Sequence, residues 1–166
     1  MAFIGVWTFA FWYDANRPSP EPLDRASQRA AAATCRSAVI SLSALTPLPP
    51  APSVAERTTR VRREDSILTD LVARLDTVRP TDRDGATALR SFATDWKHLV
   101  AARGRYADAV RSGASRPRLV IPVDPASKPV TIRMREYADI HSLFECTPDR
   151  LQGEVVEGVR TYPRKP

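Results

Sequence analysis

The chain has 166 residues, which is enough for one domain of ordinary size with tails. Its 43% hydrophobic and 27% charged residues are near the values for soluble globular domains, and only six glycines leave little room for a glycine-rich phosphate loop. The net charge of +6 raises the question of nucleic acid, but 22 of the 25 basic residues are Arg, a bias typical of GC-rich genomes. We therefore interpret the basicity as partly compositional.

The first thirteen residues, MAFIGVWTFAFWY, form an uncharged apolar segment. Its large side chains are Phe3, Ile4, Val6, Trp7, Phe9, Phe11, Trp12 and Tyr13. As a helix it would reach roughly 20 Å, short of the ~30 Å hydrocarbon core of a bilayer. Three interpretations stay open: the end of a membrane-spanning helix whose start codon was assigned too late, a segment buried against protein, or an incomplete signal sequence. We favour the first, because Trp12 and Tyr13 end the run as interfacial aromatics do.

Residues 14–23 predict a Pro-rich linker, since Pro18, Pro20 and Pro22 favour an extended spacer. A first helix is expected over 24–45, with Asp24 as N-cap and Cys35 on its apolar stripe. The Pro-rich loop 46–52 ends it. A second helix is expected to open at a capping box of Ser53 and Glu56 and to end before Pro80.

The third predicted helix, 84–112, has the clearest apolar stripe, and Gly113 is a fitting C-cap residue. The stripe comprises Leu89, Phe92, Ala93, Trp96, Leu99, Val100, Tyr106, Ala107 and Val110. Residues 114–128 predict an extended strap across the bundle rather than a strand. A fourth helix is expected from Pro129, closed by Cys146 and Pro148, before a polar tail over 151–166. The fold class is therefore all-α: a small antiparallel bundle of about four helices in 24–150.

The two cysteines, Cys35 and Cys146, permit a single disulfide. In an up-and-down bundle the middle of the first helix and the end of the fourth could be neighbours. A bridge there would close a loop of over one hundred residues, worth roughly 4–5 kcal/mol in the chain-entropy model. The alternative is two buried free thiols acting as small hydrophobes.

The order of these features resembles a set of uncharacterised actinobacterial proteins that have an N-terminal membrane segment and a small extracytoplasmic helical domain. The resemblance covers about residues 30–150. Its most specific part is the run TDWKHLVAARGRYADAV, in which Asp95 and Trp96 precede Arg103, Arg105 and Tyr106. It implies an extracytoplasmic helical fold with paired cysteines, and it implies no known reaction.

Residue types that carry metal or nucleophilic chemistry are sparse. His98 and His141 are the only histidines, and neither has further ligands at metal-site spacing. Cys146 lies five residues from His141, a poor spacing for sharing a helix face, and a disulfide would remove its thiolate. We therefore predict no enzyme activity, no metal, no cofactor and no small-molecule substrate.

Asp95 has two interpretations, a carboxylate presented to a ligand or a structural ion pair. We prefer a pair with an arginine such as Arg103 or Arg36 that fixes the register of the bundle. Trp96 and Tyr106 are expected in the core, because they lie on the apolar stripe.

Two basic clusters follow from the sequence. The first is Arg57, Arg60, Arg62 and Arg63, largely offset by Glu56, Glu64 and Asp65. The second is Lys97, Arg103, Arg105, Arg111, Arg116 and Arg118, opposed only by Asp108. Its five arginines are candidate contacts to anionic lipid head groups or to an acidic partner subunit, with a solvated face as the alternative.

These features predict a non-enzymatic cell-envelope protein with a single N-terminal membrane anchor and its domain on the extracytoplasmic side. Its expected partners are membrane lipid and another membrane protein, as an accessory or structural subunit of a larger complex. One alternative is a lipid- or small-ligand-binding bundle with a cavity between the third and fourth helices. Another is a cytosolic Arg-rich nucleic-acid-binding protein, which the lack of interleaved exposed aromatics disfavours.

Overall fold

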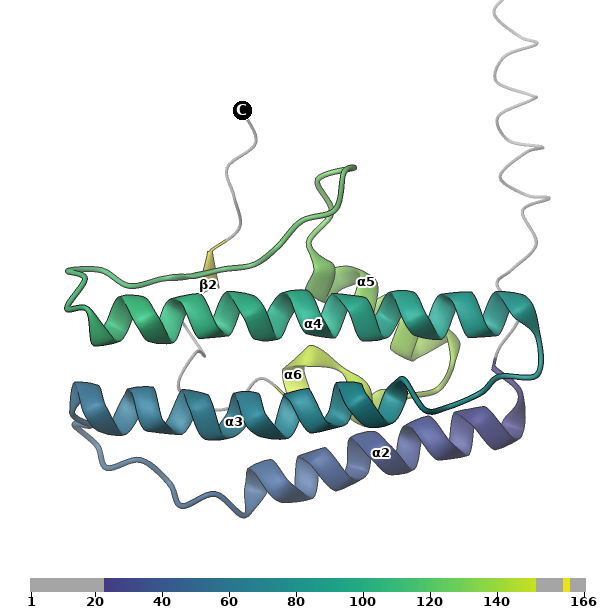
Figure 1. Ribbon diagram of the computed structural model, residues 1–166, viewed down its shortest axis with the longest axis horizontal. Coiled ribbons are helices and arrows are strands. Elements are labelled where there is room, and N and C mark those ends of the chain that lie inside the picture. The colour runs from purple at the N-terminus through teal and green to yellow at the C-terminus, as the bar shows by residue number, and fades with distance from the viewer. Residues whose placement is uncertain (1–22, 152–159, 162–166) are drawn as a thin grey trace, which may run out of the picture.

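A computed structural model describes residues 23–151 and the backbone of residues 160–161 (Figure 1). The predicted anchor over 1–13 and nearly all of the linker over 14–23 lie outside the described residues. The same holds for residues 152–159 and 162–166 of the predicted tail. These expectations therefore stay predictions.

The described chain is all-α, as predicted, and its first two helices begin at the expected caps. The main helices are α2 (Arg25–Ser43), α3 (Val54–Leu75), α4 (Arg83–Arg111) and α5 (Val130–Ile140). Asp24 caps α2 by accepting hydrogen bonds from the backbone N–H groups of Ala26 and Ser27. Ser53 and Glu56 form the predicted capping box of α3. Asp82 caps α4, which begins one residue earlier than expected.

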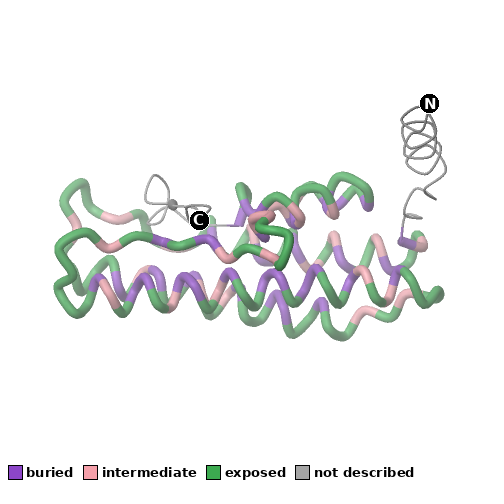
Figure 2. The backbone as a smooth tube through the Cα atoms, turned by 90° about the horizontal axis from the view of Figure 1, so that it is seen from above, coloured by how far each residue is buried: buried purple, intermediate pink, exposed green. Residues whose placement is uncertain are grey.

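The three long helices α2, α3 and α4 are each antiparallel to the next, and the segments that connect them lie at alternate ends of the bundle (Figure 1). Helix α3 packs against both α2 and α4, and α5 packs on α4. Buried and exposed positions alternate along each long helix, as amphipathic helices require (Figure 2). At 29 residues, α4 is roughly 43 Å long and extends from one end of the bundle to the other.

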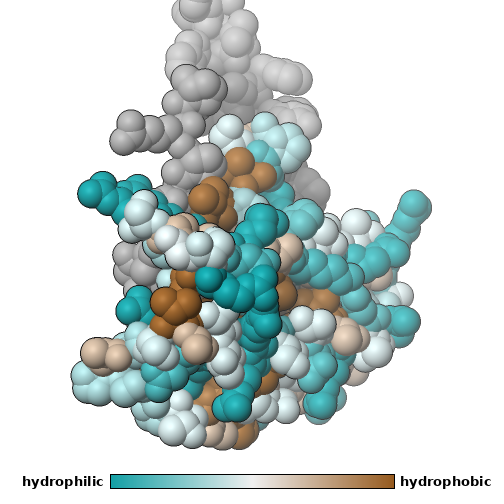
Figure 3. All heavy atoms as spheres, turned by 60° about the vertical axis from the view of Figure 1, so that its left-hand side comes forward, coloured by the Kyte–Doolittle hydropathy of each residue, from teal (hydrophilic) through white to brown (hydrophobic). Residues whose placement is uncertain are grey.

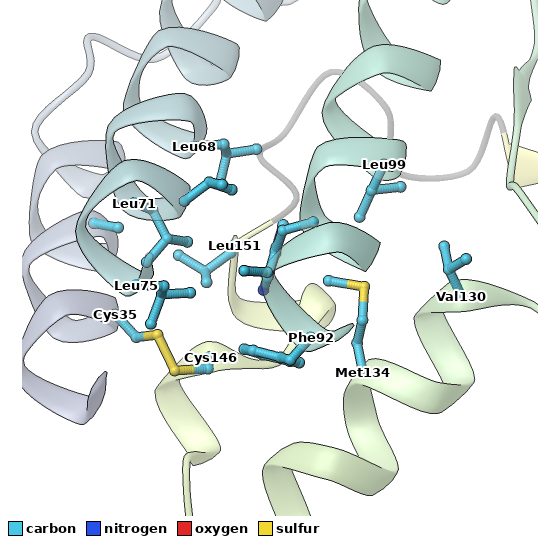
Figure 4. Close-up of a cluster of buried hydrophobic side chains, with 14 of the residues drawn as sticks. Cys35, Leu68, Leu71, Leu75, Phe92, Leu99, Val130, Met134, Cys146 and Leu151 are labelled. Carbon is cyan, nitrogen blue, oxygen red and sulfur yellow. A yellow bond between two sulfur atoms is a disulfide. The ribbon is translucent and has the colours of Figure 1, made fainter. Parts of the chain in front are cut away.

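The core is a single cluster of buried side chains from every main helix (Figure 4). Trp96 and Tyr106 lie in it, as expected from the stripe. Its largest fully buried apolar members are Leu68, Leu71, Leu75, Phe92, Trp96, Leu99, Leu119, Ile121, Met134, Leu143 and Leu151. Two short helices, η1 (Phe144–Cys146) and α6 (Pro148–Leu151), close it against α2.

The strap between α4 and α5 returns along α4, and it contains a strand that the sequence analysis did not expect. Leu119–Val120 (β1) pairs in parallel with Arg160–Thr161 (β2). Leu119 and Ile121 are buried while Val120 between them is exposed, which is the alternation of a half-buried strand. The extended run LVI therefore both covers the core and offers its backbone to the returning chain.

Among the described residues, none of the helices combines the length and the apolar character needed to cross a bilayer.

Candidate functional site

The described residues contain four features that bear on function: a disulfide, two buried ion networks and an arginine-rich end. The disulfide joins Cys35 of α2 to Cys146 of η1 across a sequence separation of 111 residues, with 5.1 Å between the Cα atoms. Both residues are fully buried. They lie at the edge of the core beside Leu75 and Phe92 (Figure 4). The structure thus has the predicted bridge and not the alternative of two free thiols.

A four-residue ion network crosses the interface between α3 and α4. The Arg103 guanidinium donates to Glu64 Oε2 at 2.6 Å and to Asp65 Oδ1 at 2.5 Å. Arg60 donates from Nε to Glu64 Oε1 at 2.6 Å and from Nη1 to the carbonyl oxygen of Thr46 at 2.7 Å. Among the described residues, two guanidinium groups therefore meet two carboxylates, and the charges of these four side chains balance. Burial raises the pKa of Asp65, against the opposing effect of Arg103.

Arg103 corrects one of our predictions. It was expected to contact an anionic surface, but its side chain is fully buried, as is that of Glu64. The sequence does indicate this burial, because Arg103 and Glu64 fall at the helical spacing of the apolar stripes. Arg103 follows Leu99 by four residues and precedes Tyr106 by three, while Glu64 follows Val61 by three and precedes Leu68 by four. Both charged residues therefore occupy core positions of facing helices.

A second network joins α4, the strap and α5 through Arg133. Arg133 pairs with Asp95 of α4 and donates from Nη1 to Asp124 Oδ2 of the strap at 3.2 Å. Asp95 is therefore a structural ion pair, as preferred, but its partner is neither Arg103 nor Arg36. Arg36 instead pairs weakly with Glu145 at 3.7 Å. The effect of Asp95 is to hold α5 on α4.

The two carboxylates beside Arg133 have pKa values shifted in opposite directions. Burial raises the pKa of Asp95, with Arg133 opposing the shift. The pKa of Asp124 is lowered, first by the backbone N–H of Lys128 and also by Arg133. The difference follows from position, because Asp95 lies inside the helix interface and Asp124 in a turn of the strap.

His141 ties the start of the described chain to the end of α5. Its Nδ1 accepts a hydrogen bond from the Leu23 N–H at 3.0 Å, and its carbonyl oxygen accepts one from Gln28 Nε2 at 3.0 Å. The imidazole is buried against the Tyr137 ring, with 4.1 Å between the ring centroids. Burial lowers the pKa of His141. His141 is thus a structural histidine that fixes Leu23 and Gln28 against the end of α5.

Aromatic rings fill the seam between α4 and α5, where the ligand-binding alternative places a cavity. Phe92 stacks on Tyr137 with centroids 4.5 Å apart and meets Trp96 edge to face at 6.5 Å. The Trp96 indole N–H and the Tyr137 hydroxyl have no hydrogen-bond partner in the described part of the chain. Burial also raises the pKa of Tyr137. These two groups are the buried side-chain polar atoms that the described residues leave without a partner.

The four remaining predicted contact residues, Arg105, Arg111, Arg116 and Arg118, are exposed and lie at or near the C-terminal end of α4. Of these, Arg111 pairs with Asp108 at 2.9 Å. Their role as contacts to an anionic surface stays a prediction. Among the described residues, no group of three or more His, Cys, Asp or Glu side chains is placed to hold a metal ion.

In comparisons with protein-family models, curated proteins and solved structures, nothing matches this chain. The resemblance to actinobacterial membrane-anchored proteins therefore stays a prediction, and the function must be argued from the chain itself.

Proposed function

We propose that this protein is a non-enzymatic, membrane-anchored subunit of the cell envelope, with its helical domain outside the cytoplasm as an accessory or structural part of a larger membrane complex. The observation that carries the proposal is the buried Cys35–Cys146 disulfide. Such bridges persist in oxidising compartments and are rare in the cytosol, where thiols are kept reduced. The apolar segment over 1–13 and the Pro-rich linker after it supply a tether and a spacer on the N-terminal side.

The buried charges support the structural part of this role. Arg103 of α4 pairs with two adjacent carboxylates of α3. Arg133 of α5 pairs with one carboxylate of α4 and one of the strap. A buried ion pair contributes little net stability, but it penalises any arrangement that separates its members. The networks therefore favour one register of α3, α4 and α5, which suits a rigid domain that presents a fixed surface.

Topology can be tested with a single added thiol. Ser115 is exposed in the turn after α4, so Ser115→Cys introduces a reactive group without disturbing the core. In intact cells that express the full chain, a membrane-impermeant maleimide should label this variant without permeabilisation, while the unaltered chain is labelled only after denaturation and reduction, because both of its cysteines are buried. Labelling of Ser115→Cys only after permeabilisation, or free Cys35 and Cys146 in the unaltered chain, would overturn the location.

The accessory role has a separate test. The full chain, solubilised from native membranes in a mild detergent and sized on a native gel, should migrate in an assembly larger than its 18.4 kDa monomer. A lone monomer under these conditions would refute the accessory role and leave the location untouched.

A second candidate, a lipid- or small-ligand-binding bundle, is favoured by one observation: the unsatisfied Trp96 N–H and Tyr137 hydroxyl in the seam between α4 and α5. A bound polar group would satisfy them. If so, the purified full chain should carry a co-extracted small molecule that is detectable by mass spectrometry and lost in Tyr137→Phe. Extracts of both proteins free of such a molecule would exclude this candidate.

A further inference from the structure

Among the described side chains, the positive charge is concentrated at one end of the bundle. Apart from the network around Arg103, the described part of this end has seven arginines against the carboxylates of Glu56 and Asp108, an excess of five charges. We call these seven residues the arginine end: Arg57, Arg62 and Arg63 of α3, Arg105 and Arg111 of α4, and Arg116 and Arg118 of the strap. The rest of the described chain has twelve basic and eleven acidic side chains, and is nearly neutral. The excess is therefore a local feature of the fold, not a uniform effect of composition.

The side chains of the arginine end are exposed and largely uncommitted. Arg62 and Arg111 share the carboxylate of Asp108, with Nη2–Oδ1 distances of 3.8 and 2.9 Å, and all three side chains are more than half exposed. Arg63, Arg105, Arg116 and Arg118 form no ion pair with any described residue. Figure 3 turns this end toward the viewer and shows hydrophilic side chains projecting from it, with hydrophobic surface between them.

An apolar groove opens beside these arginines. It has a volume of about 310 Å³ and lies between the loop after α2 and the first turns of α3. Its apolar lining is Leu45, Pro47, Leu48, Pro49 and Ala55. Its polar lining is Arg60, Arg63, Glu56, Thr46 and Thr59. Arg57 donates from Nε to the carbonyl oxygen of Pro52 at 3.1 Å, which holds its side chain beside the loop. The surface thus combines a small apolar groove with a cationic rim.

The arginine end also lies far from the point where the tether enters the domain. Asp24 accepts a hydrogen bond from the Thr81 N–H at 3.1 Å, so the chain enters beside the start of α4. Arg111 is the last residue of α4, roughly 40 Å away along the helix axis. Figure 1 shows these two positions at opposite ends of the bundle. An upright domain would present the arginine end away from the membrane that holds its tether.

From these observations we propose that the arginine end and its groove form a docking surface for an acidic segment of a partner protein, with apolar side chains that enter the groove. Guanidinium groups bind carboxylates in a bidentate geometry, which suits a surface whose basic side chains are all arginines. A groove takes alternate side chains of an extended peptide, whereas a flat bilayer surface would leave it unfilled. The inference deepens the proposed accessory role by stating the chemistry of the partner, but its test needs no membrane, so each can fail alone.

The test uses the purified full chain in a non-ionic detergent and a fluorescent 12-residue peptide of alternating Glu and Leu. A Glu/Ser peptide of equal charge should bind at least fivefold more weakly, because it cannot fill the groove. Arg63→Glu with Arg116→Glu should weaken Glu/Leu binding at least tenfold. The matched control, Arg25→Glu with Arg29→Glu, makes the same change in net charge at the opposite end and should stay within twofold.

The groove has its own control pair. Ala55→Trp fills the groove without altering charge and should reduce binding of the Glu/Leu peptide to the level of the Glu/Ser peptide. Ala33→Trp, at an exposed position of α2, should leave binding of the Glu/Leu peptide unchanged. Equal losses in the two charge-reversed proteins would overturn the proposal. So would arginine-dependent binding to phosphatidylglycerol vesicles or to a DNA duplex without measurable binding to the Glu/Leu peptide, because the surface would then serve a lipid or a nucleic acid.

Discussion

Replacing Arg103 by Leu should be the most damaging single change of charge in this protein. Arg103 and Glu64 are both fully buried, with their charged atoms 2.6 Å apart. Arg103→Leu would leave the Asp65 carboxylate without its arginine and the Glu64 carboxylate with Arg60 alone. Removing one member of a buried pair costs about 3–5 kcal/mol. That is a large share of the ~5–15 kcal/mol that holds a typical domain together.

The double replacement Glu64→Leu with Arg103→Leu should cost less than Arg103→Leu alone. It removes both fully buried charges and leaves Arg60 and Asp65, whose side chains are 10% and 15% exposed and can reach water. Buried pairs replaced by apolar residues are often neutral in stability. We expect a coupling free energy of about 2 kcal/mol or more from the double-mutant cycle.

The assay is urea unfolding of the oxidised protein, followed by the fluorescence of Trp96, which is buried in the core. Lys97→Ala is the matched control, because Lys97 and Asp76 form an exposed ion pair on the same helix pair, and such pairs contribute about 0.2–1 kcal/mol. The interpretation of the network would be refuted if Arg103→Leu cost no more stability than Lys97→Ala. It would also be refuted if the stability losses of Glu64→Leu and Arg103→Leu added up to the loss of the double replacement.

Three further predictions use other parts of the fold. From pH 7 to 5.5 the protein should lose stability, because burial lowers the pKa of His141 and the unfolded chain then binds a proton that the folded chain does not; His141→Asn should lack this loss in urea midpoints. The raised pKa values of Asp65 and Asp95 instead stabilise the folded chain as the pH falls further. The effect of His141 is therefore the difference in pH dependence between the unaltered protein and His141→Asn. Cys35→Ala with Cys146→Ala should lower the free energy of unfolding by about 4–5 kcal/mol, and a loss under 1 kcal/mol would count against the bridge as a main stabiliser. Asp95→Asn should cost about 2 kcal/mol and increase hydrogen exchange in α5 before α3, whereas uniform exchange across both helices would contradict a local role for the Arg133 network.

Local signals in the sequence were sufficient to predict the helices. Asp24, the Ser53–Glu56 box and Gly113 mark helix ends through interactions within a few residues, so they are visible without tertiary structure. The apolar stripes likewise identify the buried faces. The disulfide was predictable because an up-and-down order of helices brings the end of the bundle's last segment near the middle of α2. The prediction that one helix runs from Pro129 to Cys146 was wrong, because α5 ends at Ile140 and Cys146 lies in η1.

The partners of buried charges could not be predicted in the same way. Arg103 and Glu64 interrupt the apolar stripes of α4 and α3 at facing positions. That they form a pair can be predicted only when the register of one helix against the other is known. Asp95 finds Arg133, 38 residues away on α5, and not an arginine of α2 or its own helix. The strand Leu119–Val120 depends on residues 160–161, which no local pattern connects to the strap.

The positions of Cys35 and Cys146 in the sequence also determine when the disulfide can form during synthesis of the chain. Cys35 leaves the ribosome 111 residues before Cys146, so at ~5–20 residues per second the nascent chain exposes an unpaired thiol for on the order of ten seconds. Because the sequence has two cysteines, one chain has no alternative pairing, and a wrong disulfide has to link Cys35 or Cys146 to a thiol of another molecule. Until Cys146 is available, the thiol of Cys35 is therefore open to such intermolecular bridges, one of which is a covalent dimer of the chain.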